Sequence, residues 1–474
     1  MYAVLSAIIF IAMVVTISVV IRDASKQSPG LLSVRNLFLM GLFVFQFTSG
    51  IIALLAPALT DPYMFSDRVV PGAKFTFMLL LFTAGFMWIY RSGFIANTLV
   101  FKTKMRSVHV TWPKLCTLSL TFLVLGAVFR LGLSRLPYVG IYSIELGASF
   151  FALATGLAAW AWVPRLYNPI PMFIAAVVVL GGLGILFADS FGRRDMLGIV
   201  LAFIWGAYYS SWRYISFRKL IFRFSIISVC GVFFLAAYTS TRFNYGIEIS
   251  SPIDRVKVLA EADILQGTTD LFSGQSSALY SMYFLDTRPD RFEYDTLHSL
   301  KLFFVLPIPR KMWREKPNAL ALTSVSEIND AGRPKGWNIG PGLIGHCAND
   351  NPYIALPLYT LILAVFFRFI DGLLSRHSLN PFVVLPMGVA LGQIIAIPRG
   401  ELGNFFGKTV LYLVGSWIAM QIVARLHQMV SPNSSMLSSG EDDEWDESAY
   451  ESSYYEYDDD ERSVDDDSDY SQNY

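Results

Sequence analysis

Residues 2–21, YAVLSAIIFIAMVVTISVVI, form an apolar run that contains no charged residue. About 20 such residues in a helix are enough to cross the hydrocarbon core of a bilayer. The whole 474-residue chain is 54% hydrophobic and 16% charged, with a mean hydropathy of +0.47. A water-soluble protein has too little interior for this much apolar surface. The composition therefore predicts an all-α integral membrane protein and excludes a disordered chain, a disulfide scaffold and a typical nucleic-acid binder.

Eleven runs are candidates for transmembrane helices, within a range of ten to twelve. They are residues 2–21, 37–59, 74–95, 114–134, 141–163, 168–188, 196–212, 222–240, 352–371, 379–398 and 404–424. The first run lacks the basic segment and the small-residue cleavage site of a signal peptide, so we expect it to be retained as a helix.

The arginines and lysines of the short loops predict the orientation. One set of alternate loops carries sixteen of them and the other set six. The richer set is expected in the cytoplasm. This places the N-terminus outside, the segment 241–351 outside as one large extracytoplasmic loop, and the C-terminus inside.

Four regions follow from this threading. Residues 1–240 form an N-terminal bundle of about eight helices, and residues 352–426 supply the C-terminal transmembrane helices. The loop 241–351 contains apolar runs at 278–285 and 300–309, too short to span, which are typical of interfacial or re-entrant helices lying against the bundle. Residues 427–474 are rich in Ser, Asp, Glu and Tyr, and we expect a disordered acidic tail in the cytoplasm. Without residues 441–474 the chain has 36 basic and 21 acidic residues.

Charged residues gather at the expected outer ends of the helices, where charge in a membrane protein often marks function. They include Arg130, Arg135, Glu145, Asp189, Arg193, Arg194, Arg399 and Glu401. The alternative for each one alone is a side chain that extends to the water interface from a helix end.

The most distinctive segment is PIPRKMWREKP at 307–317. Its first two prolines stop any helix before Arg310. A helical turn beyond them would place Arg310 and Arg314 on one face, where two guanidinium groups suit a phosphate or diphosphate. Trp313 would cover a sugar ring or anchor at the membrane interface. Lys311 and Lys316 add positive charge, and contact with anionic lipid head groups is the alternative.

Two further segments supply groups for proton transfer or phosphate binding. His346 follows a glycine-rich stretch and is the first candidate for proton transfer near neutral pH, with His298 as a weaker one; a structural hydrogen-bonding role is the alternative. Arg399 and Glu401 lie just before the last apolar run. They are expected either to bind a phosphate or to cap that helix. The chain contains no HExxH, no Cys/His metal spacing, no GxSxG and no P-loop. We therefore expect no metal and no cofactor.

These features together resemble the bacterial O-antigen and exopolysaccharide repeat-unit polymerases (Wzy-type), which are related to the O-antigen ligases. The resemblance covers about residues 1–425. It is carried by Pro307-Ile308-Pro309-Arg310 with Lys316-Pro317, by Gly340-Pro341-Gly342, and by Arg399-Gly400-Glu401, together with many spans, one late large loop and few helices after it.

The resemblance implies a metal-independent glycosyltransferase at the outer face of the cytoplasmic (inner) membrane. Its substrates would be polyprenyl-diphosphate-linked oligosaccharide repeat units, and its further partners membrane lipid and a chain-length regulator or export proteins. Arg310 would hold the leaving diphosphate, assisted by Arg314 and Arg399, with Lys311, Trp313 and Lys316 beside them. His346, or Glu401 as the second choice, would accept the proton of the attacking hydroxyl.

Three other interpretations stay open. A ligase would share the loop and the arginines but use another acceptor. A transporter of lipid-linked oligosaccharides would instead place charges near the bilayer midplane and show internal symmetry. A membrane scaffold using the acidic tail would leave the PIPRKMW segment without a role.

Overall fold

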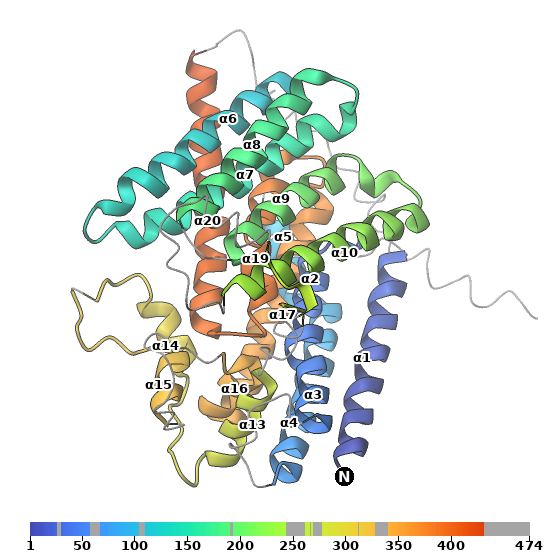
Figure 1. Ribbon diagram of the computed structural model, residues 1–474, viewed down its shortest axis with the longest axis vertical. Coiled ribbons are helices and arrows are strands. Elements are labelled where there is room, and N and C mark those ends of the chain that lie inside the picture. Colours follow the sequence, from blue (N-terminus) through green and yellow to red (C-terminus); the bar gives the residue numbers. More distant parts are fainter. Residues whose placement is uncertain are drawn as a thin grey trace, which may run out of the picture. The chain divides into compact units, whose positions relative to one another are not determined.

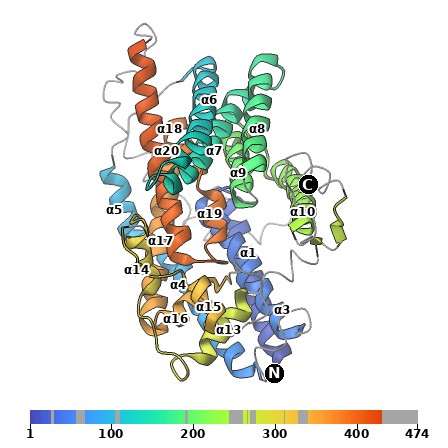
Figure 2. The same ribbon diagram turned by 60° about the vertical axis from the view of Figure 1, so that its left-hand side comes forward.

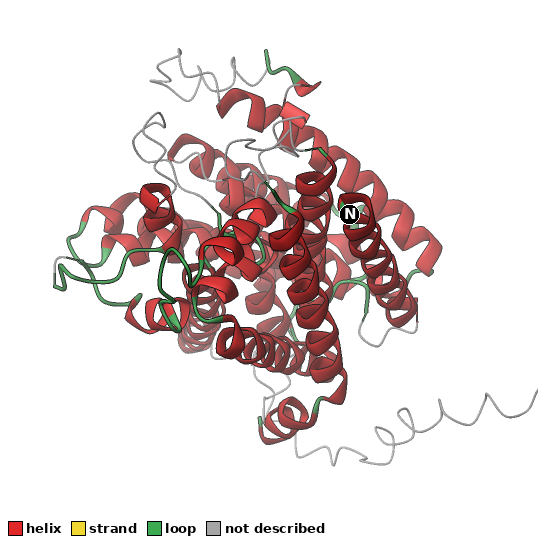
Figure 3. Cartoon of the chain, turned by 90° about the horizontal axis from the view of Figure 1, so that it is seen from below, coloured by secondary structure: helices red, strands yellow, loops and turns green. Residues whose placement is uncertain are grey.

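The fold is all-helical throughout the described part of the chain. The computed structural model describes residues 1–25, 30–56, 67–103, 110–189, 193–242, 261–265, 267–268, 277–310, 312–327 and 340–430. Figure 3 shows helices and loops and no strand in these ranges. The expected acidic tail lies almost entirely outside them, so its structure stays a prediction.

Within the described ranges, eight helices are long and apolar enough to cross a membrane. They are Tyr2–Ser25, Val34–Leu55, Val69–Ser92, Trp112–Arg135, Gly140–Arg165, Pro169–Ala188, Pro352–Arg376 and Leu402–Leu426. The protein is therefore a helical membrane protein, as the composition predicts. The three other expected runs fall on α9 (Arg193–Ser210), on α10 (Phe217–Arg242) and on a pair of short helices, α18 (Pro381–Gly388) and α19 (Leu391–Ala396). The number of spans beyond eight stays a prediction.

Several spans are built from more than one helical segment. The second joins α2 (Val34–Leu42), the π-helix η1 (Phe43–Thr48) and α3 (Ser49–Leu55), and the fourth joins α6 (Trp112–Ala127), the π-helix η3 (Val128–Gly132) and the 3₁₀ helix η4 (Leu133–Arg135). The remaining spans are α1 (Tyr2–Ser25), α4 (Val69–Ser92), α7 (Gly140–Trp162), α8 (Pro169–Asp189), α17 (Pro352–Arg376) and α20 (Leu402–Val430).

Charged contacts tie the helices together at one end of the bundle. Asp23 at the end of α1 pairs with Arg35 in the first turn of α2, 2.9 Å away. Asp371 near the end of α17 accepts hydrogen bonds from the backbone N–H groups of Val34 and Arg35 and from the hydroxyl of Tyr90 in α4. The ends of α1, α4 and α17 and the start of α2 therefore meet in one buried polar cluster.

The segment expected as the large loop lies at the opposite end. It contains α13 (Ser277–Thr287), α14 (His298–Val305), α15 (Leu320–Glu327) and α16 (Gly342–Asn349). Figures 1 and 2 show these helices at the end of the bundle where the N-terminus lies. Lys74 at the start of α4 donates to the carbonyl of Leu285 in α13. The N-terminus and the loop thus share one end, as expected; which side faces the cytoplasm stays a prediction.

One segment of this loop is buried within the bundle. The run at 278–285, expected as an interfacial or re-entrant helix, lies in α13, where every residue from Ser277 to Leu285 is buried. The helix packs between α16 and α4, because its small and aromatic side chains fill the interior instead of facing head groups. α14 keeps an exposed apolar side chain, Phe304, which is 68% accessible.

Two of the charged residues that the sequence placed at helix ends are paired between helices. Glu145 in α7 accepts from Lys408 (2.5 Å) and from the hydroxyl of Tyr412 (2.8 Å), both in α20. Arg130 in the π-helix η3 lies 3.7 Å from Asp195 in α9. Unpaired charge is costly in a bilayer, and these two pairs join four helical segments.

Two glycines of α20 allow α14 to pack closely against it. A Cβ at Gly403 would overlap the backbone carbonyl oxygen of Ser299, whereas a Cβ at Gly407 would meet only the end of the Leu306 side chain. Small residues at this spacing let two helices approach at backbone distance in membranes. α14 is thereby held against the first turns of α20.

We expect Gly403→Ala to lower the free energy of unfolding by about 1–3 kcal/mol, because overpacking against a backbone atom forces the helices apart. Gly407→Ala is the matched control, since a leucine methyl can move. Thermal unfolding of the detergent-solubilised variants measures both effects. Equal losses of stability would contradict the close contact at Gly403.

Candidate functional site

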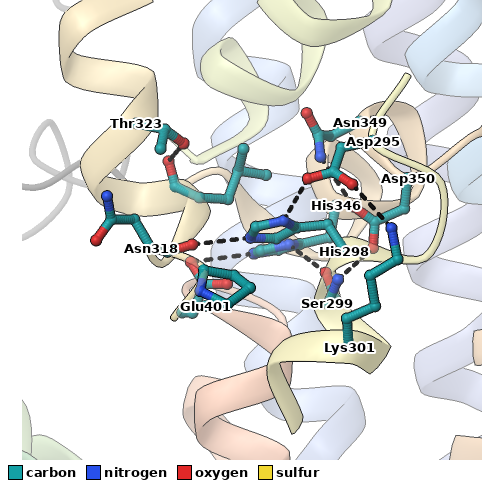
Figure 4. A network of polar contacts seen from close by, with 12 residues as sticks. Asp295, His298, Ser299, Lys301, Asn318, Thr323, His346, Asn349, Asp350 and Glu401 are labelled. Atoms are coloured by element: carbon teal, nitrogen blue, oxygen red, sulfur yellow. Dashed lines mark hydrogen bonds and ion pairs between the residues drawn. The ribbon is translucent and has the colours of Figure 1, made fainter. Parts of the chain in front are cut away.

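The candidate site lies where α14, α16 and the start of α20 meet, at the end of the bundle that carries the loop. His346 and Glu401, which the sequence nominated separately, lie 3.9 Å apart in one polar network (Figure 4). Arg310 contacts the edge of this network through the side chain of Asn318. The network also includes residues that the sequence did not nominate.

His346 lies in α16, in the interior. Its side chain is fully buried, with Nδ1 2.7 Å from the hydroxyl of Ser299 in α14. Nε2 lies 3.0 Å from the carbonyl oxygen of Gly400 and 3.2 Å from the backbone nitrogen of Leu402. Burial lowers the pKa of His346, so the neutral imidazole is favoured. Both ring nitrogens are engaged by the protein, and the ring is positioned to orient its neighbours.

Glu401 immediately precedes α20 and is 4% exposed. Its Oε2 accepts a hydrogen bond of 3.0 Å from the backbone N–H of Ala321 in α15 and lies 3.9 Å from Nε2 of His346. Its Oε1 is buried without a hydrogen-bond partner. A buried carboxylate oxygen without a donor is unfavourable and calls for an explanation. Oε1 of Glu401 is therefore able to accept a hydrogen bond or a proton from a bound group.

Asp350 closes the buried side of the network. Its carboxylate accepts hydrogen bonds from the backbone N–H of Ser299 (2.7 Å), the hydroxyl of Tyr359 (2.5 Å) and the amide of Asn349 (2.9 Å). Burial raises the pKa of Asp350, although these donors oppose the shift. The sequence analysis did not propose Asp350 or Ser299. The signal was an acidic residue in a buried segment, Asn349-Asp350, immediately before an apolar run.

The cationic segment is a loop without a regular helix in its described residues. The backbone N–H groups of Met312 and Trp313 both donate to the carbonyl of Pro309, which makes one turn directly after the prolines. The expected common face of Arg310 and Arg314 stays a prediction. Arg310 donates to the carbonyls of Lys316 and Pro317 (both 3.3 Å) and to Oδ1 of Asn318 (2.7 Å). Prolines at both ends of the segment disfavour a helix, and the loop is held instead by its own side chains.

Lys316 also holds the cationic loop, through hydrogen bonds to the backbone near the start of the loop. Its ammonium group donates to the carbonyls of Leu306 and Ile308, both at 2.9 Å. Burial, and then the nearby charge of Arg310, lower the pKa of Lys316. Lys316 therefore contacts the backbone of the loop, whereas the sequence placed it at the substrate.

Several residues of the cationic loop are accessible to solvent. Arg310, Arg314 and Met312 are exposed, and Trp313 is 38% accessible. Lys311 lies outside the described residues. Leu306, at the start of the segment, accepts a hydrogen bond from the hydroxyl of Tyr142 in α7. The cations are thus presented at the ends of the transmembrane helices.

Arg399 is held on the bundle instead of the loop. Its guanidinium lies over the ring of Phe45 in η1, 5.6 Å from the centroid. The neighbouring carbonyl of Pro398 accepts from Gln46 (2.7 Å) and from the backbone of Leu343 (3.1 Å). Arg399 and Glu401 therefore precede α20 as expected, and Arg399 is joined to the π-helix of the second span.

A small apolar hollow of about 30 Å³ adjoins the network, between α14, α17 and α20. Its lining residues are Ser299, Leu300, Phe303, Tyr359, Ile362, Leu363, Leu402, Gly403 and Phe406.

The chain has no detected relative among known proteins. No family model, no curated protein and no solved structure matches it. The function is therefore argued from the site alone.

Proposed function

We propose that this protein is a membrane glycosyltransferase that polymerises polyprenyl-diphosphate-linked oligosaccharide repeat units at the outer face of a cytoplasmic membrane. The observation that carries the proposal is the pairing of a buried acid–base network, Glu401–His346–Ser299, with an exposed cationic loop that is linked to it through Asn318 and α15. A diphosphate leaving group needs the cations, and an attacking hydroxyl needs the base.

The cationic loop is proposed as the site of the donor diphosphate. Arg310 retains N–H groups beyond its contacts with the loop, and Arg314 lies exposed four residues further on. Guanidinium groups bind phosphate oxygens in a fixed geometry. Fixed positive charge stabilises the negative charge that develops on a departing diphosphate.

The bond changes in the proposed step are those of a glycosyl transfer. A hydroxyl oxygen of the acceptor repeat unit forms a bond to the anomeric carbon of the donor. The bond from that carbon to the diphosphate oxygen breaks, and the polyprenyl diphosphate leaves with both bonding electrons. The hydroxyl proton passes to Glu401.

The geometry favours Glu401 over His346 as the proton acceptor, which reverses the order given by the sequence. Among the described residues nothing donates a hydrogen bond to Oε1 of Glu401, whereas both nitrogens of His346 are engaged. We assign His346 the role of a positioning residue. It lies 3.9 Å from the carboxylate of Glu401 and is itself held by Ser299.

A glycolipid profile of a strain that lacks this protein tests the function. A polymerase predicts the accumulation of single repeat units on the lipid carrier. Accumulation of long lipid-linked chains would indicate a ligase instead, and an unchanged profile would contradict both.

A further inference from the structure

His298, which the proposed mechanism does not use, is held between two hydrogen-bond acceptors. Its Nδ1 lies 2.5 Å from Oδ2 of Asp295, and its Nε2 lies 2.9 Å from the backbone carbonyl oxygen of Asn318 (Figure 4). A backbone carbonyl and an ionised carboxylate can only accept. Both contacts are therefore satisfied together only when both ring nitrogens carry a proton.

Asp295 is ionised, as its contact with a protonated Nδ1 of His298 requires. Burial raises the pKa of Asp295, but the charge and hydrogen bond of His298, together with Lys301, outweigh burial and lower that pKa overall. Lys301 donates to the other carboxylate oxygen, 3.2 Å away. The carboxylate consequently stays ionised over the range in which histidine titrates, and it is protonated only in acid, well below that range.

The contact with Asn318 links His298 to the cationic loop. Asn318 presents its carbonyl to His298 and its side-chain oxygen to Nη2 of Arg310, at 2.7 Å. We infer that His298 is a positioning residue whose doubly protonated ring joins Asp295 to Asn318 and so fixes the loop that carries Arg310. The expected effect of His298 on turnover rests on the proposed function, whereas its effect on the loop does not.

Loss of one proton from His298 breaks its contact with Asn318 in the loop. The remaining proton stays on Nδ1, because the hydrogen bond to a carboxylate is the stronger of the two. Nε2 then turns a lone pair towards the carbonyl oxygen of Asn318, and the contact becomes repulsive. The link from Asp295 to Asn318 is thus complete when both ring nitrogens of His298 carry a proton, and it is lost when Nε2 has none.

Other charged groups lie around His298 on the elements that pack against it. Asp295 and Lys301 lie on its own side, and Arg310 and Lys316 lie in the loop beyond Asn318. From α16, His346 and Asp350 face α14, and Glu401 precedes α20. Burial favours neutral His346, so the proton that controls the loop belongs to His298.

Hydrogen–deuterium exchange of the 310–320 peptide tests the inference on the full-length protein in lipid nanodiscs. After correction for intrinsic exchange, we expect the peptide to exchange roughly tenfold faster at about pH 9 than at about pH 6, because a charge-assisted hydrogen bond is lost. His298→Ala should exchange fast at both pH values.

Asp295→Asn is the decisive variant. An asparagine amide donates to Nδ1, so neutral His298 keeps its proton on Nε2 and holds Asn318 at both pH values. We expect slow exchange throughout, together with polymerising activity that persists at alkaline pH. Lys301→Met, which removes a charge but keeps the Asp295–His298 contact, is the control and should retain the pH dependence.

Exchange that does not depend on pH in the wild-type protein, or that still accelerates at alkaline pH in Asp295→Asn, would overturn the inference. If the exchange follows the expected pattern while no variant forms polymer, the positioning role of His298 is supported and the proposed function fails. The two failures are therefore distinguishable.

Discussion

Glu401→Gln is expected to reduce polymer formation by about 10²–10⁴-fold, the contribution typical of a general base. Glutamine has nearly the same shape, and its side-chain oxygen still accepts from the backbone N–H of Ala321, 3.0 Å from Oε2 in the structure. It lacks only the ability to take a proton through the oxygen that has no partner. The fold should therefore persist while turnover is lost.

The measurement is the rate of repeat-unit transfer in reconstituted membranes, alongside the thermal unfolding midpoint. Glu315→Gln is a suitable control, because Glu315 is an exposed carboxylate of the cationic loop. Its activity should remain near that of the wild-type protein. Full activity of Glu401→Gln would remove Glu401 from the mechanism and return the role of base to another group.

Arg310→Lys is expected to lower the transfer rate by about 10²–10³-fold, the magnitude seen when a single donor to a developing negative charge is lost. Lysine keeps the positive charge but not the planar fork that matches phosphate oxygens. Since the other cations of the loop still bind the donor in the ground state, the loss should fall mainly on kcat.

Asn318→Ala separates this effect from a purely structural one. The variant removes the side-chain oxygen that accepts from Arg310 at 2.7 Å but leaves the guanidinium in place. A direct role of Arg310 predicts a much smaller loss for Asn318→Ala than for Arg310→Lys. Equal losses in the two variants would show that Arg310 only maintains the loop.

The hydrophobic pattern was sufficient to locate the helices. The run at 2–21 became α1, and the runs at 141–163 and 168–188 became α7 and α8. A spanning helix depends on the apolarity of consecutive residues, which is a local property. The same pattern did not show that α13 would be buried, because that depends on its packing against α4 and α16, far away in the sequence.

The site was predicted in part. His346 and Glu401 were nominated as separate residues, and the structure brings them within 3.9 Å. Ser299 and Asp350 were missed, since nothing in the sequence places α14 beside α16. The contacts of Arg310 and Lys316 with backbone carbonyls, which hold the cationic segment as a loop, were also missed, because no local pattern in the sequence specifies them.

The central claim is that this membrane protein joins lipid-linked repeat units. The direct test places the purified protein in liposomes with a lipid-linked repeat unit as the only substrate and separates the products by size. The account predicts a ladder of evenly spaced lipid-linked chains with the wild-type protein and none with Glu401→Gln. Repeat units that stay single while crossing from one leaflet to the other would contradict it and identify a transporter.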